Sequence, residues 1–186
     1  MRLRRAVAGR ANVAFQCRDI TDLSHLADAS VDAVISCMSL HHLPTWDHLK
    51  RTLDEVARVV KAEGGIYIAD FGRLRSQRSM RRFAFDHVDR QHPRFTEDYM
   101  NSLRAAFTRE DFARACEQLG SRAILHATGC VPFMLALKTP PRHDLPTDLA
   151  SRFRRSAGDL DAAQHSDLQA IIRAFRAGGL KTAAFR

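Results

Sequence analysis

VDAVISCMSLHHLPTWDHLKRTLDEVARVVKAEGGIYIADF, residues 31–71, is the stretch of sequence that decides the fold. Residues 31–38 form a nearly continuous apolar run with β-branched side chains, which predicts a strand covered on both faces. Over residues 46–61 the apolar side chains recur every three or four positions, which predicts a helix that ends in a turn at 63–65. Residues 66–71 predict a second buried strand. A strand, a helix and a strand in this order predict a right-handed crossover and therefore a parallel sheet.

Upstream of this unit, residues 2–9 predict the end of a helix, and Asn12 to Ile20 predict a short strand because VAFQC is rich in residues that favour strands. The polar stretch 21–30 predicts a loop or a single helical turn.

Downstream, the sequence predicts more helices and a different end to the sheet. Residues 122–128 and 131–137 predict two strands joined by a tight turn at Gly129, and hence an antiparallel pair. Prolines at 140, 141 and 146 predict a linker. The predicted helices are arginine-rich pieces within 76–106, interrupted at His92-Pro93, a helix over 108–119 and an amphipathic helix over 159–177.

Composition excludes several classes of protein. Hydrophobic and charged contents of 45% and 27% are ordinary for a soluble globular protein. No apolar run has the length of a membrane span, and the N-terminus lacks the apolar core of a signal peptide, so we expect a cytoplasmic protein without a membrane contact. The four cysteines are scattered singly, which predicts reduced thiols and no metal site.

The net charge of +8 is unevenly distributed, because all of the excess lies in residues 73–186. Residues 73–94 alone hold seven arginines and two aspartates. A solvated helical face, a site for an acidic or phosphorylated substrate and an RNA surface are the alternatives for this segment. Few aromatic side chains are interleaved with the arginines, so nucleic acid is the weakest of the three.

Parallel strands that end in an antiparallel pair resemble the second half of the class I S-adenosylmethionine-dependent methyltransferase fold. The residues agree: CRDI (17–20), VDAVIS (31–36) and LHHL (40–43) resemble successive family motifs, and VVKAEGG (59–65) resembles the end of the family's next helix.

The resemblance covers residues 1–138 and implies an α/β, Rossmann-like methyltransferase fold without its first two strands, ending in the antiparallel pair. Within that partial domain, residues 72–106 are expected to form a substrate cap. Residues 139–186 are expected to form a linker and a C-terminal helical extension.

The resemblance also implies how S-adenosylmethionine would be held. The carboxylate of Asp19 would accept a hydrogen bond from the adenine amino group, and the backbone amide of Ile20 would contact the ring. The backbone at Cys37 and Met38 would run beside the methionine portion of the cofactor. A turn or helix-capping role is the alternative for Asp19.

Two histidines follow the first predicted strand of the crossover unit. The resemblance places His42 against the cofactor or substrate and makes His41 available as a catalytic base, which is needed only if the acceptor must lose a proton. Solvent-facing or capping histidines are the alternative. Asp70, at the end of IYIADF, points at the same edge of the sheet, with turn and capping roles equally open.

Two absent motifs favour a small-molecule acceptor, which the arginines suggest is acidic. There is no Asn/Asp-Pro-Pro-Tyr/Phe run of amino-directed nucleic-acid methyltransferases and no Pro-Cys of the cytosine-C5 type. We therefore expect methyl transfer to a small molecule in the complete protein.

The family's glycine-rich loop and ribose-binding carboxylate are also absent, so the S-adenosylmethionine site is expected to be incomplete. The two missing strands would lie between residues 13–17 and 31–38, which leaves an apolar sheet edge open. Three explanations compete: a gene model begun at an internal methionine, a split enzyme completed by another chain, and a non-catalytic remnant. The remnant would act as an interaction module that pairs with a partner chain or another copy through that edge.

Overall fold

The computed structural model describes residues 12–144 and 146–181. Its centre is a four-stranded mixed sheet with the strand order β1-β2-β4-β3. β1 is parallel to β2, whereas β4 is antiparallel to both of its neighbours, β2 and β3. The strands are β1 (Val31–Cys37), β2 (Val60–Phe71), β3 (Ile124–Ala127) and β4 (Met134–Lys138). The expected α/β fold with a terminal antiparallel pair is therefore confirmed.

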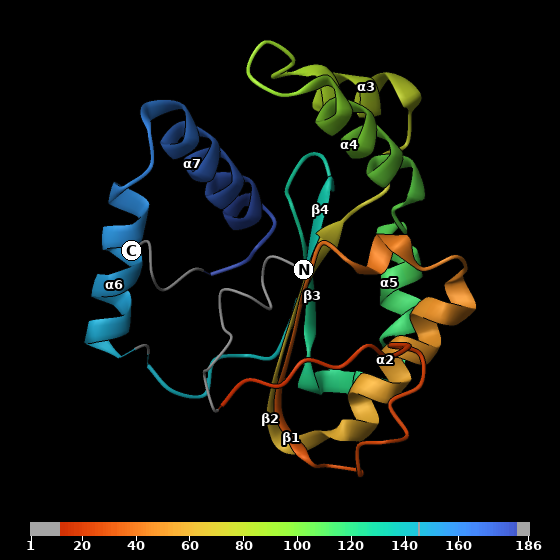
Figure 1. Cartoon of the computed structure of the whole chain (residues 1–186). Coiled ribbons are helices and arrows are strands. Elements are labelled where there is room, and N and C mark those ends of the chain that lie inside the picture. Colours follow the sequence, from red (N-terminus) through yellow and green to blue (C-terminus); the bar gives the residue numbers. More distant parts are fainter. Residues whose placement is uncertain (1–11, 145, 182–186) are drawn as a thin grey trace.

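One face of the sheet carries the main core. Helices α2 (Trp46–Val59) and α5 (Arg109–Ala115) lie on this side, as Figure 1 shows. Leu49 and Leu53 of α2 are completely buried against strand residues such as Ile68. The helix predicted over 108–119 is shorter than expected, because a 3₁₀ segment, η2 (Glu117–Arg122), replaces its last turns.

β2 begins earlier than predicted. Its first residue, Val60, still donates its backbone N–H to Val56 of α2 and already pairs with Val31 of β1. The register then shifts between Val31 and Ala33, where Ala33 pairs with Gly65. The expected glycine turn is therefore an irregularity within the strand, of the kind that bends a strand without ending it.

Two helices form a layer beyond the end of the sheet. α3 (Gln77–Phe85) and α4 (Pro93–Ala105) pack on each other through a second, smaller core. Figure 1 shows this pair above the strands. Pro93 occupies the first turn of α4, where a missing N–H costs nothing, so the predicted interruption at His92-Pro93 is confirmed.

The C-terminal helices α6 (Thr147–Gly158) and α7 (Ala162–Ala177) lie on the side of the sheet opposite to α2 (Figure 1). α7 confirms the predicted amphipathic helix and begins at an Asp161 capping box. Its Phe175 packs on Ala136 of β4. α6 was not predicted, and none of its described side chains is buried.

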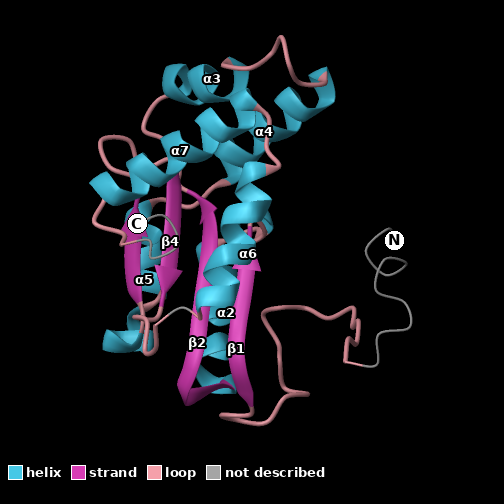
Figure 2. Cartoon of the chain, turned by 90° about the vertical axis from the view of Figure 1, so that its left-hand side faces the viewer, coloured by secondary structure: helices cyan, strands magenta, loops and turns pink. Residues whose placement is uncertain are grey.

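Three expectations about the strands were wrong. Residues 12–20 form no strand, and Figure 2 shows the segment as a loop outside the sheet, on the β1 side. A strand needs a hydrogen-bonded neighbour, and no described strand pairs with the outer edge of β1. β1 is also not covered on both faces, because Ile35 is 73% exposed. Finally, residues 128–133 make a longer connection than the expected tight turn. The helix predicted at 2–9 lies outside the described residues.

Candidate functional site at the carboxyl edge of the sheet

The carboxyl ends of β1 and β2 meet at one edge, where parallel strands in open α/β sheets place their ligands. Cys37 and Ala69 are register partners there, and the N–H of Met38 donates to the carbonyl of Ala69 at 2.8 Å. Met38 has a φ of +53°, which turns the chain sharply into a 3₁₀ helix, η1 (Leu40–His42). Positive φ at a residue with a side chain is uncommon and marks a constrained turn.

Asp70 holds this turn in place. It is 1% exposed, and its Oδ2 accepts hydrogen bonds from the backbone N–H groups of Ser39, Leu40 and His41 at 3.1, 2.6 and 3.3 Å. These are the N–H groups that the start of a short helix leaves without partners. A single buried carboxylate on β2 therefore organises the loop that follows β1.

The same carboxylate binds the His41 ring. Oδ1 of Asp70 lies 2.6 Å from Nδ1 of His41, whose side chain is only 4% exposed. A carboxylate accepts, so Nδ1 carries the proton in the neutral ring and Nε2 keeps its lone pair. Nε2 makes no hydrogen bond with the residues that the structure describes. The arrangement presents a basic nitrogen whose tautomer and orientation are set by a buried acid.

Aromatic rings surround the His41 imidazole. The ring centroid of His42 lies 4.1 Å away and that of Phe71 lies 5.2 Å away. Phe71 in turn lies 5.2 Å from Tyr99 of α4. The layer formed by α3 and α4 therefore reaches residues 38–42, the histidine turn, through ring contacts. Burial raises the pKa of Tyr99, which favours its neutral phenol.

The structure brings four of the predicted site residues to this edge. Cys37 is exposed at the end of β1, Met38 is half-buried, His41 is buried and His42 is exposed. His42 faces solvent and is accessible to a ligand. His41 is almost completely buried, so a ligand can contact only a small part of its side chain.

Asp19 and Ile20 lie in a separate loop. Oδ1 of Asp19 accepts hydrogen bonds from the backbone N–H and the hydroxyl of Thr21 at 2.9 and 2.8 Å, and these bonds lower the pKa of the carboxyl. This is the turn-forming role expected as the alternative for Asp19. Ile20 is 40% exposed. No hydrogen bond joins either residue to η1, and the adenine-binding role stays a prediction.

The glycines near this edge decide whether a cofactor can approach the backbone closely. Gly72 directly follows β2 at the carboxyl edge, but a Cβ there would lie 2.1 Å from the carbonyl oxygen of Pro132, so this glycine allows protein packing rather than a cofactor's approach. None of the other described glycines that have open space beside them lies at this edge: they are Gly120, Gly158 and Gly179. The described residues at this edge thus include no glycine-rich loop with open space beside it. They also hold no cluster of three or more side chains suited to a metal ion.

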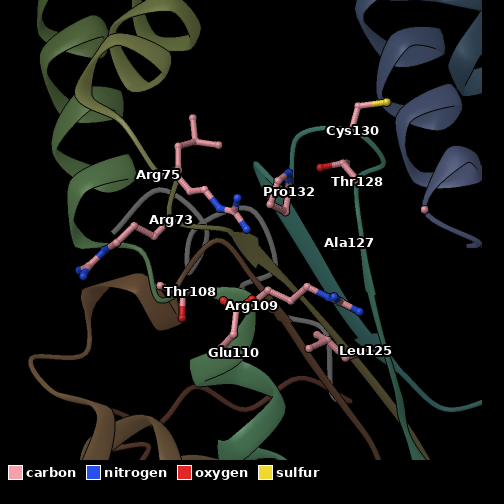
Figure 3. Close-up of a pocket in the computed structure, with 12 residues that line it drawn as sticks. Arg73, Arg75, Thr108, Arg109, Glu110, Leu125, Ala127, Thr128, Cys130 and Pro132 are labelled. Carbon is pink, nitrogen blue, oxygen red and sulfur yellow. The ribbon is translucent and has the colours of Figure 1, made fainter.

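Two features were not identified from the sequence. The first is the pairing of Asp70 with His41, for which the signal was a polar residue at the end of each of two adjacent parallel strands. The second is a pocket of about 520 Å³ beside this edge, drawn in Figure 3. It is lined by the segment after β2, the start of α5 and the end of β3, which are remote from one another in the sequence.

Comparison with known families agrees with this topology. Residues 1–68 match a family model described as a methyltransferase domain. The match includes β1, the histidine turn, α2 and most of β2. The predicted resemblance to a methyltransferase is therefore confirmed over residues 1–68.

Solved structures with a similar course include a protein from Pyrococcus horikoshii OT3 at 17% identity and TM-score 0.47. A SAM-dependent methyltransferase from Aquifex aeolicus has 14% identity and a TM-score of 0.43. An arsenic(III) S-adenosylmethionine methyltransferase from Chlamydomonas reinhardtii has 21% identity and a TM-score of 0.48. The alignments cover 74%, 74% and 75% of this chain, and 65%, 59% and 46% of those proteins. The chain thus spans less than two thirds of the length of each. Among the described residues, no helix is both long and apolar enough to cross a bilayer.

Proposed function

We propose that this chain contributes the substrate-side half of an S-adenosylmethionine-dependent methyltransferase that acts on a small-molecule acceptor. The observation that carries the proposal is the buried pair of His41 and Asp70, 2.6 Å apart at the carboxyl edge of a sheet whose first strands match a methyltransferase domain. The absence of the nucleic-acid methyltransferase motifs supports a small-molecule acceptor.

When bound, S-adenosylmethionine supplies an electrophilic methyl group, and the protein's task is to align the acceptor in line with it. His41 can take the proton of an acceptor hydroxyl, thiol or amine at Nε2, because Asp70 holds Nδ1 protonated. Asp70 acts as a positioning residue, since its carboxylate both orients the ring and anchors the turn. This division of roles suits an acceptor that must lose a proton to become nucleophilic.

Asp19, Ile20, Cys37, Met38 and His42 are the residues proposed to contact the cofactor. The lack of a glycine cradle in the described part of the chain supports the further proposal that these residues do not bind it tightly without a second segment. Such a segment would supply the loop that wraps the methionine and ribose portions.

Calorimetric titration of the chain with S-adenosylhomocysteine tests this proposal. We expect no saturable heat at micromolar ligand, and micromolar binding would disprove the incomplete site. A longer protein that joins this chain to a segment carrying the glycine-rich loop should bind S-adenosylhomocysteine. In that longer protein, His41→Ala should lower kcat for methyl transfer while leaving S-adenosylhomocysteine affinity unchanged. Full activity in His41→Ala would exclude His41 as the base.

The second candidate function is a non-catalytic interaction module. It is favoured by the outer edge of β1, which pairs with no strand that the structure describes. The exposed pair Ile35 and Tyr67, register partners on the sheet face away from α2, also favours it. A stable oligomer that binds no S-adenosylhomocysteine, even with the upstream segment present, would favour this alternative over the enzyme.

A further inference from the structure

The pocket in Figure 3 lies where the chain leaves β2. Arg73, Leu74 and Arg75 follow the last strand residue, Phe71, after a single glycine and form one wall. The first residues of α5 and the end of β3 form the others. β3 runs parallel to β2, because both are antiparallel to β4, so its end faces the same edge as Asp70. The pocket therefore lies at the same edge of the sheet as the histidine turn.

Two cations in this pocket lack partners. Arg75 and Arg109 are exposed, and neither side chain forms a hydrogen bond or ion pair with any residue that the structure describes. In Figure 3 both extend into the space between α5 and the β3–β4 connection. Arg73 differs, since its guanidinium donates to the carbonyl of Arg104 at 3.1 Å. Glu110 is the one acidic side chain in the lining, so positive charge dominates.

The rest of the lining is apolar or small. Leu74, Leu125, Ala127 and Pro132 provide an apolar surface, and no aromatic ring lines the pocket. A volume of about 520 Å³ falls within the range of small-molecule sites, which runs from roughly 300 to 1,000 Å³. Nucleic-acid strands are usually held by stacking on aromatic rings, so this lining favours a small molecule over RNA.

We propose that this pocket binds a small organic anion, with a carboxylate or phosphate held between Arg75 and Arg109 and an apolar body against Leu125 and Pro132. Guanidinium groups present their N–H donors in the geometry that planar or tetrahedral oxyanions accept. This inference rests on the proposed function, because it names the class of acceptor that the methyltransferase would take. An acceptor anchored here by its anionic group would lie beside the end of β2, the strand that carries Asp70.

Binding is tested with phenyl phosphate, phenylacetate and the neutral benzyl alcohol, without S-adenosylmethionine, by amide chemical shifts and calorimetry. We expect one of the two anions to bind saturably, with shifts at residues 73–75 and 108–110, and benzyl alcohol to bind much more weakly. Which anion binds more tightly distinguishes a phosphate from a carboxylate ligand. Arg75→Ala and Arg109→Ala should each weaken binding roughly tenfold, because each removes a charge-assisted hydrogen bond.

Arg78→Ala is the matched control, since Arg78 is exposed on α3, outside this pocket, and its loss changes the net charge equally. It should leave the affinity unchanged. An equal weakening by Arg78→Ala, unchanged affinity in Arg75→Ala/Arg109→Ala, or tighter binding of single-stranded RNA than of either anion would overturn the proposal. Circular dichroism verifies that each variant is folded. Because no cofactor is present, a negative result here leaves the methyl-transfer proposal standing, and failure to bind S-adenosylhomocysteine does not affect this one.

Discussion

Nδ1 of His41 and Oδ1 of Asp70 lie 2.6 Å apart, and the second oxygen of the same carboxylate binds three consecutive backbone N–H groups of the histidine turn. One side chain from β2 thus fixes both the backbone and the ring that follow β1. The local structure and the proposed chemistry of this edge depend on the same group.

Asp70→Asn should destabilise the fold by about 3 kcal/mol, because the amide cannot accept all of these hydrogen bonds and buries an NH₂ beside N–H donors. Urea denaturation followed by circular dichroism measures this loss. Asp32→Asn is the matched control: Asp32 is 88% exposed and pairs with Lys61 on the surface, so its loss should be far smaller. Equal losses in the two variants would show that Asp70 is not a structural anchor.

The neutral His41 ring should be the Nδ1–H tautomer. Long-range ¹H–¹⁵N spectra distinguish the two ring nitrogens, and Nε2 should show the shift of an unprotonated nitrogen. Asp70→Asn should shift the tautomer equilibrium toward Nε2–H, because the carboxylate acceptor is gone. His42, exposed and without such a partner in the described residues, serves as the internal reference. An Nε2–H tautomer in the unmodified protein would contradict the proposed base.

Stability should fall on acidification in a way that depends on Glu55. Hydrogen bonds from the Arg58 guanidinium, together with the N–H of Leu23 at 2.8 Å, hold the pKa of Glu55 below its ordinary value of 4.5, against the effect of burial. The folded state therefore gains stability from the charged form above that value. This gain is lost as the pH falls through the lowered pKa.

Glu55→Gln should accordingly lower the melting temperature by a few degrees at pH 7 and narrow the difference between wild type and variant below pH 4. Differential scanning calorimetry at stepped pH measures both. A gap between the two proteins that is constant from pH 7 to pH 3 would assign the effect to something other than this carboxylate.

The contact between α7 and the sheet should tolerate no side chain at Gly178. A Cβ there would lie 1.7 Å from the carbonyl oxygen of Ala127, so Gly178→Ala should cost on the order of 2 kcal/mol and detach the end of α7. Gly158→Ala is the control, since a Cβ at the end of α6 meets nothing within 4 Å. Urea denaturation and amide exchange of α7 measure the two effects, and equal stability of both variants would refute the close contact.

Ile35 should mediate self-association rather than folding. Because it is 73% exposed, Ile35→Lys should change stability by less than about 0.5 kcal/mol, and a charge beside an open edge should oppose strand pairing between copies. Sedimentation velocity should therefore show less self-association than in wild type. Val34→Lys, on the core side of the same strand, should unfold the protein. Unchanged association in Ile35→Lys would exclude this face as an interface.

The sequence by itself determined those helices and strands that the local spacing of apolar residues predicts. The strand–helix–strand unit over 31–71, the antiparallel pair and the helix α7 were all predicted, because helical hydrogen bonds and apolar spacing are local properties of the chain. The sequence also placed the histidine turn at the carboxyl edge of the sheet, because parallel strands have their carboxyl ends at the same edge.

Only the tertiary structure decided which elements acquire partners. VAFQC favours a strand, yet it is a loop, because strand formation depends on a neighbour that no local pattern specifies. His41 and Asp70 are 29 residues apart in sequence, and Arg75 and Arg109 reach one pocket from different segments. Such pairs depend on register and packing, so the chemistry of this edge appears only once β1 and β2 lie side by side.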